Sequence, residues 1–309
     1  MKFQWPNNKK FAFTIIDDTD NGTVENTKPV YDFLYKKGII TTKTVWVYPP
    51  RDKFTGGCLL DNEYLDFILE LQSRGFEIGL HNVGSGKFER DEIIEGIEIF
   101  KQKLGFYPKI QINHASNIDN IYWGSERYQS LLRIIIRLLY GDRRKYHGSD
   151  VNSKYFWGDV CKEKIKYIRN YTFNDINTLK LDPLMPYMDK DKLDYSNYWF
   201  SSSDGHTVEE FNHLVRKENI DKLEAEGGAC IVYTHFASGF VDRKGKLNQE
   251  FIENIEYLSS KDGWFVPAGT LLDYLLSQKS TQHVSKIYLN RLDFKWVIDR
   301  VIKKLKFNR

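Results

Sequence analysis

The stretch FTIIDDTDNG, residues 13 to 22, is an apolar run that stops at two adjacent carboxylates, Asp17 and Asp18, with a third, Asp20, two positions on. A short run rich in β-branched and aromatic residues predicts a buried strand. An acidic cluster after a single strand is most often a solvated turn. The residues at the ends of the other strands therefore decide how these carboxylates are interpreted.

Similar runs recur along the sequence and alternate with stretches of helical periodicity, such as 62–75 and 89–105, which end at glycines. This alternation predicts an α/β fold with a parallel sheet. Because seven or eight such strand-helix units occur, we expect a distorted or incomplete (β/α) barrel of seven to eight parallel strands. The runs that we interpret as strands are 11–16, 42–48, 76–80, 109–113, 197–202, 230–234 and 264–268.

The composition excludes several classes of protein. A net charge of +3 without a recognisable nucleic-acid-binding motif argues against a nucleic-acid partner. The three cysteines, Cys58, Cys161 and Cys230, are far apart and have no C-x-x-C spacing, so we expect neither disulfides nor a thiolate zinc site. No signal-peptide pattern and no run of about 18 apolar residues occurs, and we expect a cytoplasmic protein.

In a parallel barrel the carboxyl ends of all strands lie at one face, which is where such barrels place their active sites. Four of the seven histidines fall at or near these strand ends. Together with the neighbouring acids and amide they predict a polar site with metal-ligand chemistry. The residues concerned are Asp17, Asp18, His81, Asn113, His114, Asp204, His206 and His235.

Four motifs in order, TIIDDTD, GFEIGLHNVGSG, GFYPKIQINHAS and IVYTHF, resemble those of the polysaccharide deacetylase family, the NodB-homology domain of the carbohydrate esterases. The resemblance covers roughly residues 10 to 275, with the middle third unmatched, and marks a divergent member. It implies a metal-dependent hydrolase that removes an N- or O-acetyl group from a sugar in surface-polysaccharide or lipid-linked glycan biosynthesis.

Carried over to this chain, the resemblance makes Asp17 the general base, Asp18 and His81 metal ligands, and His235 the general acid. The implied cofactor is a divalent metal, zinc in the first place, with cobalt, nickel or manganese as alternatives. Such an ion polarises an acyl carbonyl and acidifies a water, while a carboxylate accepts the water's proton and a histidine protonates the leaving group.

The chain departs from the family at three positions, the first of which is Thr19 in place of the first-motif glycine. Ser85 stands where the family has its second histidine, and the arginine of the third motif, which helps to set the catalytic aspartate, has no match in 109–116. We expect His114 to replace the missing ligand, and His206 is the second choice. The alternative for His114 is that it contacts the substrate. Asn113, Asp204 and His206 are expected to bind substrate, although Asp204 could equally orient His235 or lie in a helix N-cap region.

We expect a barrel over residues 1–280, with an insertion at about 117–196 that shapes the substrate pocket, and a basic amphipathic helix over 281–309. The apolar segment 131–140 within the insertion is predicted to pack on the barrel, to form a dimer interface or to contact membrane. The tail 286–309 is predicted either to dock on the barrel or to bind anionic lipid at the inner face of the membrane. The second alternative suggests a lipid-linked carbohydrate substrate.

Two other functions remain open at this point. One is a metal-free glycoside hydrolase that uses paired carboxylates, with Asp17 or Asp18 and Asp204 as candidates. The other is a catalytically silent glycan-binding protein on the same fold, which the missing second histidine permits. A fold alone does not choose among these functions.

Overall fold

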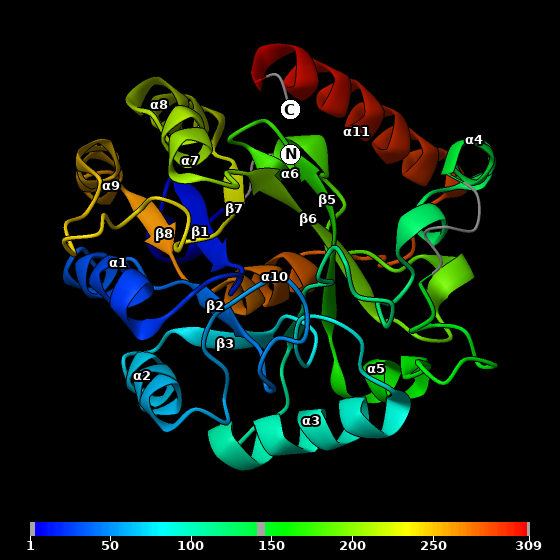
Figure 1. Cartoon of the computed structure of the whole chain (residues 1–309). Helices are drawn as coiled ribbons and strands as arrows, with labels where there is room; N and C mark the ends of the chain where they lie inside the picture. Colours follow the sequence, from blue (N-terminus) through cyan, green and yellow to red (C-terminus); the bar gives the residue numbers. More distant parts are fainter. Residues whose placement is uncertain (1–3, 141–145, 308–309) are drawn as a thin grey trace.

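The computed structural model describes residues 4–140 and 146–307. Within them, eight parallel strands form one sheet in the order β2-β3-β4-β5-β6-β7-β1-β8, and a further pairing between β1 and β2 closes β1 to β7 into a barrel (Figure 1). The strands are β1 (Phe11–Asp17), β2 (Thr42–Val45), β3 (Glu77–Leu80), β4 (Ile110–Gln111), β5 (Tyr167–Phe173), β6 (Tyr198–Asp204), β7 (Ala229–Thr234) and β8 (Gly263–Phe265).

Strand β1 changes partner along its length, which distorts the barrel. Its amino-terminal half pairs with β8, from Phe11 to Phe13, whereas its last two residues, Ile16 and Asp17, pair with β2. On its other side β1 pairs with β7 over nearly its whole length. The predicted distorted barrel of parallel strands is thus confirmed, with β8 outside the closed ring.

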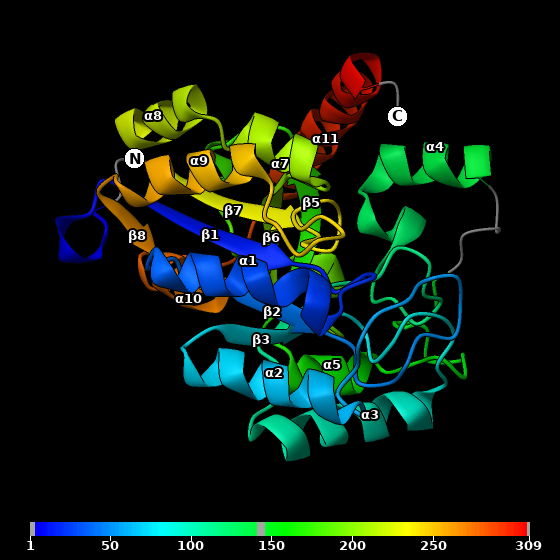
Figure 2. The same cartoon turned by 60° about the vertical axis from the view of Figure 1, so that its left-hand side comes forward.

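The helices cover the outside of the barrel, and the loops after the strands gather on one side (Figure 2). Helix α1 begins with a capping box in which Thr23 and Asn26 each bind the other's backbone N–H. The helices are α1 (Val24–Lys36), α2 (Asn62–Ser73), α3 (Arg90–Leu104), α4 (Ser130–Tyr140), α5 (Gly158–Lys164), α6 (Thr178–Leu181), α7 (Val208–Leu214), α8 (Lys217–Glu226), α9 (Gln249–Ser259), α10 (Ala268–Ser277) and α11 (Lys286–Phe307), with short 3-10 turns η1 (Pro6–Asn8), η2 (Gly124–Arg127) and η4 (Lys190–Lys192).

Strand β5 lies inside the segment 117–196, where the sequence analysis identified no strand. It is almost wholly buried and pairs with β4 on one side and β6 on the other, so the barrel closes through it. Two polar residues, Arg169 and Asn170, interrupt its apolar pattern, and both are buried. The segment therefore supplies a barrel strand as well as the loops and α4 around it.

The end of β1 is held by a buried ion pair. Lys43 Nζ lies 2.8 Å from Asp17 Oδ2, and neither side chain is exposed. The Tyr31 hydroxyl donates to the same oxygen at 2.9 Å, and the Phe236 N–H donates to Asp17 Oδ1 at 2.8 Å. Burial opposes the charge of Lys43, but Asp17 outweighs it and raises the lysine pKa. Asp17 therefore joins β1 to β2, α1 and the segment after β7.

Helix α11 packs beside β5 at one flank of the barrel (Figure 1). Leu289 and Leu292 are buried, and the carboxylate of Asp293 accepts hydrogen bonds from the Gln129 N–H and the Tyr171 hydroxyl. The helix thus docks on the barrel, one of the two expectations for this segment. No helix in the described part of the chain is long and apolar enough to cross a membrane.

The buried ion pair makes a testable contribution to stability. Lys43→Met leaves Asp17 charged in a site that water does not reach, and breaking a buried pair in this way costs about 3–5 kcal/mol. We expect the free energy of unfolding, measured by urea titration, to fall by that amount. Lys36→Met, an exposed change in the same region, should alter it by less than about 0.5 kcal/mol. Equal effects of the two substitutions would contradict this role.

Candidate functional site

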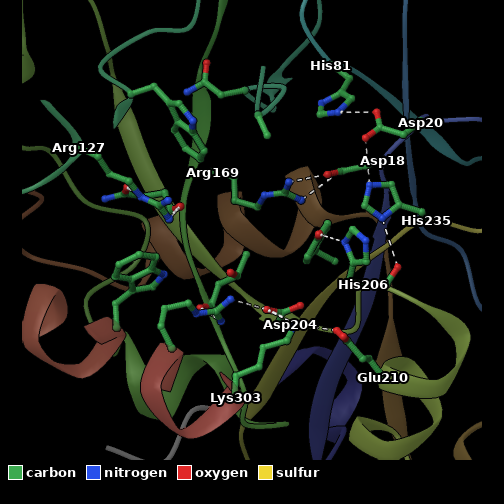
Figure 3. Close-up of a pocket in the computed structure, with 18 of the residues that line it drawn as sticks. Asp18, Asp20, His81, Arg127, Arg169, Asp204, His206, Glu210, His235 and Lys303 are labelled. Atoms are coloured by element: carbon green, nitrogen blue, oxygen red, sulfur yellow. Dashed lines mark hydrogen bonds and ion pairs between the residues drawn. The ribbon is translucent and has the colours of Figure 1, made fainter. Parts of the chain in front are cut away.

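A pocket of about 760 Å³ opens at the carboxyl ends of the strands (Figure 3). One end is lined by Asp18, Asp20 and His81 from the segments after β1 and β3, together with His235 after β7. The opposite wall comes from η2, β5 and α11. The pocket therefore draws side chains from segments distant in sequence, as expected for the carboxyl face of a parallel barrel.

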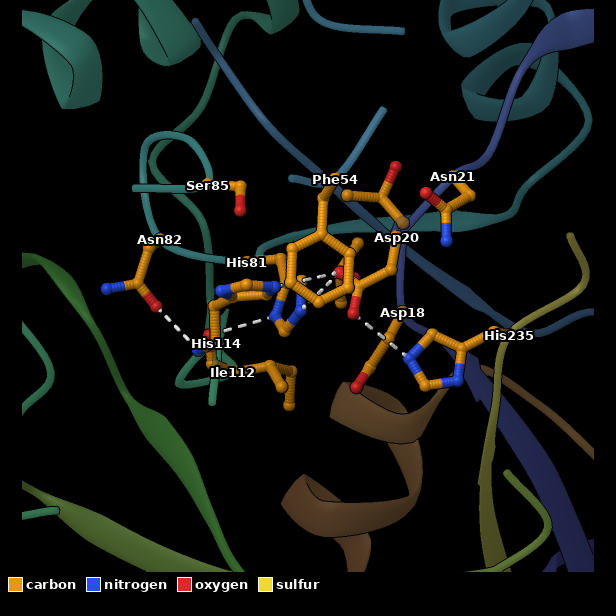
Figure 4. A network of polar contacts seen from close by, with 12 residues as sticks. Asp18, Asp20, Asn21, Phe54, His81, Asn82, Ser85, Ile112, His114 and His235 are labelled. Carbon is orange, nitrogen blue, oxygen red and sulfur yellow. Dashed lines mark hydrogen bonds and ion pairs between the residues drawn. The ribbon is translucent and has the colours of Figure 1, made fainter. Parts of the chain in front are cut away.

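Asp20 is the centre of a histidine cluster (Figure 4). Its Oδ1 lies 3.1 Å from His81 Nε2 and 3.4 Å from His114 Nε2, and its Oδ2 lies 3.3 Å from His235 Nε2. One ligand atom from each of Asp20, His81 and His114 lies within 4.8 Å of the others, an arrangement that could hold a metal ion. Burial opposes ionisation of Asp20, but the three histidines prevail and its pKa is lowered.

The hydrogen bonds of His81 fix which of its nitrogens faces the cluster. Its Nδ1 lies 3.1 Å from the carbonyl oxygen of Ile112, which can only accept, so Nδ1 carries the proton. In the neutral ring Nε2 then holds a lone pair, and this lone pair faces the carboxylate of Asp20. Two acceptors at 3.1 Å need a cation or a proton between them.

His114 is oriented in the same way. Its Nδ1 lies 3.1 Å from Asn117 Oδ1, and that amide is itself fixed because its Nδ2 donates to the Gly84 carbonyl. The lone pair of His114 Nε2 is therefore turned toward Asp20. Both His114 Nε2 and Asp20 Oδ1 are buried without a hydrogen-bond partner. Since a buried polar atom without a partner is costly, these two atoms fit a cation bound between them.

Asp18 is bound by an arginine rather than by the histidine cluster. Arg169 Nη1 and Nη2 reach Asp18 Oδ1 and Oδ2 at 3.0 and 2.5 Å, and the guanidinium lies 4.4 Å from the centre of the Tyr233 ring. Burial would raise the pKa of Asp18, but Arg169, helped by His81 and His235, lowers it overall. Asp18 is consequently an ionised, oriented carboxylate that lines the pocket.

His235 lies between Asp20 and His206. Its Nδ1 lies 3.2 Å from the His206 carbonyl oxygen, which leaves Nε2 toward Asp20. Burial would lower the pKa of His235, but Asp20 and Asp18 raise it. For His206 the balance is the opposite, because burial and the neighbouring His235 lower its pKa. His206 Nδ1 contacts the Tyr233 hydroxyl at 2.5 Å, and its ring lines the pocket.

Two further residues expected at the substrate site line the pocket while their polar groups contact the protein. Asn113 donates to the Ile121 carbonyl and accepts from the Ile121 N–H, which holds the loop after β4. Asp204 accepts from Arg300 at 2.9 Å and lies 3.0 Å from Lys303 Nζ. Burial would raise the pKa of Asp204, but these two cations lower it.

The structure thus groups most of the sequence-predicted residues at one end of the barrel but separates Asp17 and Ser85 from the cluster. Asp17 is enclosed by its own partners and does not line the pocket. Ser85 donates to Asp52 Oδ1 at 2.7 Å. Asp18 and Asp20 are the first-strand carboxylates that reach the pocket.

Sequence reasoning did not identify Asp20 or Arg169 as site residues. Asp20 is given no role in the sequence analysis, although its place as a third acid in DDTD is a signal. Arg169 was missed because its strand was missed. The signal there was a charged residue within the run YIRNYTF, since a buried strand rarely carries an arginine without a partner.

The comparison with solved structures supports the fold. No protein-family model and no curated protein sequence matches the chain. Solved structures match at 12% identity. A probable polysaccharide deacetylase from Pseudomonas aeruginosa PAO1 aligns with a TM-score of 0.56 over 90% of this chain and 95% of its own. Puue allantoinase aligns with a TM-score of 0.55 over 89% of this chain and 93% of its own.

A Mycobacterium smegmatis protein, provisionally assigned as a polysaccharide deacetylase, aligns with a TM-score of 0.53 over 92% of this chain and 96% of its own. All three alignments span nearly the whole of both chains, so the similarity concerns the complete barrel and not a shared fragment. The chain therefore has the same barrel fold as these three proteins.

Proposed function

We propose that this protein is a metal-dependent hydrolase that removes an acyl group, N- or O-acetyl, from a carbohydrate. The observation that supports it most is the convergence of two imidazole lone pairs, from His81 and His114, on the carboxylate of Asp20, whose Oδ1 is buried. An ionised carboxylate, Asp18, lies in the same pocket. A cation site next to an ionised carboxylate is an arrangement that suits hydrolysis of an acyl group.

Asp20, His81 and His114 would hold the cation, with zinc the first candidate and cobalt, nickel or manganese as alternatives. Two imidazoles and one carboxylate form a donor set that catalytic zinc sites use, with positions left for water and substrate. When bound, the ion would polarise the acyl carbonyl and lower the pKa of a water. Ser85, at the position where the resemblance places a histidine, has no part in this set.

The general base in this proposal is Asp18, not Asp17. Arg169 orients Asp18 through two hydrogen bonds and holds it ionised, so that it can accept a proton from water. Asp17 has no open side for a water, because Lys43, Tyr31 and the Phe236 N–H enclose it. Two roles from the resemblance therefore move along the chain in this proposal: the base from Asp17 to Asp18, and the ligand from Asp18 to Asp20.

His235 remains the proposed general acid. Its raised pKa keeps the imidazolium populated, and Nε2 points to the pocket end where the leaving amine or alkoxide would form. The arginine that the resemblance expected in the segment 109–116 is supplied instead by β5, through Arg169. The family's orienting contact to the base would thus be made from a different strand.

A carbohydrate substrate fits the walls of the pocket. Phe54, Trp123 and Trp296 line it, and flat aromatic faces with a few polar groups are typical of sites that bind sugar rings. Asn113 and His206 remain proposed substrate contacts. Asp204 is ion-paired and held ionised, which disfavours it as the acid of a glycoside hydrolase.

Contact with a membrane surface extends this proposal. Helix α11 docks through one face and leaves apolar side chains of another face exposed, among them Val301 and Leu305. Helix α4 likewise exposes Leu138 and Leu139. Apolar residues on a basic helix suit the surface of an anionic bilayer, where a lipid-linked sugar would be available. We place the protein in the cytoplasm, at the inner face of the membrane.

The metal ligands can be tested by zinc titration calorimetry on metal-depleted protein. Asp20→Ala and His114→Ala each remove a ligand, so affinity should fall by more than the roughly 10 to 100-fold that loss of a supporting contact costs. Asp18→Asn and Ser85→Ala should bind zinc as the wild type does. If Asp18→Asn lost zinc while Asp20→Ala kept it, the ligand role would return to Asp18.

The base can be tested by acetate release from 4-nitrophenyl acetate and from acetylated oligosaccharides. Asp18→Asn keeps the shape of the side chain but cannot accept a proton, and turnover should fall by about 10² to 10⁴-fold with zinc still bound. Asp242→Asn, an exposed change of the same kind, should leave turnover unaltered. Full turnover in Asp18→Asn would exclude it as the base.

Membrane contact can be tested by flotation with vesicles that contain anionic lipid. Val301→Ser with Leu305→Ser removes exposed apolar surface from α11 without touching its docked face, and should reduce the bound fraction severalfold. The matched control is Leu60→Ser with Val151→Ser, which removes exposed apolar surface elsewhere. Equal flotation of the two double variants and the wild type would argue against membrane contact through α11.

A further inference from the structure

The wall of the pocket opposite Asp20 contains a buried arginine, Arg127, at the end of η2 (Figure 3). Only 8% of its surface is exposed. Its Nε donates to Asn170 Oδ1 at 3.0 Å, and Nη2 donates to the Asn170 carbonyl. No carboxylate of a described residue forms an ion pair with it. Arg127 is therefore a buried charge whose hydrogen-bond partners are neutral, while the carboxylate of Asp293 attracts it without forming an ion pair.

The acids of the pocket are already committed to other cations. Asp18 is bound by Arg169. Asp204 is bound by Arg300 and Lys303, and Lys303 also contacts Glu210 at 2.7 Å. None of these carboxylates remains to neutralise Arg127.

The neighbours of Arg127 make its isolation more costly. Burial is the main cause that lowers its pKa, and repulsion from Arg300 and Arg169 adds to it. A guanidinium nevertheless stays protonated in proteins, so the positive charge persists. Lys304, exposed on α11, adds a further cation to the same pocket. This end of the pocket is electropositive.

Aromatic rings hold the guanidinium in place. Its Cζ lies 4.5 Å from the ring centre of Trp123, 4.9 Å from that of Tyr171 and 5.3 Å from that of Trp296. These contacts offset part of the cost of burial and fix the plane of the group. They supply no full counter-charge. A fixed guanidinium of this kind suits an anion with two oxygens, which it can bind through paired hydrogen bonds.

We propose that Arg127 binds an anionic group, a carboxylate or a phosphate, carried by the acylated sugar. The acyl group would lie at the Asp20 end of the pocket, and Trp123 and Trp296 would flank the sugar beside the anion. This inference rests on the proposed function for the reaction, but the anion site itself does not depend on the metal. It narrows the substrate class from carbohydrates in general to acidic or phosphorylated sugars.

The test is calorimetric titration of metal-depleted protein with three probes: N-acetylglucosamine, N-acetylglucosamine 1-phosphate and N-acetylglucosaminuronic acid. At least one anionic probe should bind the wild type about tenfold or more tightly than the neutral sugar. Arg127→Gln should abolish that preference. Arg137→Gln, which removes an exposed arginine of α4 outside the pocket, should retain it. Preference for one anionic probe over the other identifies phosphate or carboxylate as the natural group.

Arg127→Lys tests geometry and guards against a folding defect, because it keeps the charge but loses the paired hydrogen bonds. It should show an intermediate preference, with a melting temperature that confirms a folded protein. Equal affinity of the wild type for all three probes would overturn the inference, even if zinc binding and acetate release were normal. A preference for anions that Arg127→Gln abolishes would support the inference. It would do so even if the protein bound no metal and the proposed hydrolase function were wrong.

Discussion

The buried ion pair between Asp17 and Lys43 is the interaction on which the geometry of the site depends. Both side chains are fully buried, and Asp17 is also bound by Tyr31 and the Phe236 N–H. This network ties the last residue of β1 to β2, α1 and the segment after β7. Because the strand is fixed there, the next residues leave it in a defined direction and present Asp18 and Asp20 at the pocket. Replacing Lys43 by an apolar side chain would leave Asp17 without its counter-charge and destabilise the end of β1.

The three carboxylates of DDTD thus occupy three environments within four residues. Asp17 is enclosed by protein, Asp18 is oriented by Arg169, and Asp20 faces the histidines. Burial opposes ionisation of both Asp18 and Asp20, and in each case neighbouring cationic groups reverse its effect. Adjacent aspartates are therefore not equivalent, since the chemistry of each depends on its partners and not on residue type.

Much of the fold was predictable, because strands and helices alternate with clear periodicity and the strand ends carry the histidines. The positions of His81 and His235 at one face follow from that pattern alone. Strand β5 was not predicted because Arg169 and Asn170 interrupt its apolar run. The burial of these two residues is explained by their hydrogen bonds to Asp18 and Arg127, which only the folded structure brings beside them. The roles of Asp17 and Asp20 could not be read from the sequence either, since they depend on Lys43 and His114 from distant segments.

The central claim is that a metal binds at Asp20, with Asp18 outside the metal site as the base, and that the pocket beyond it is built for an acidic sugar. Anomalous scattering from crystals grown with zinc or cobalt tests the first part directly. The account predicts an anomalous peak within bonding distance of Asp20, His81 and His114, with Asp18 still held by Arg169. A peak bound by Asp18 without Asp20, or no peak after reconstitution with zinc, cobalt, nickel and manganese, would contradict it.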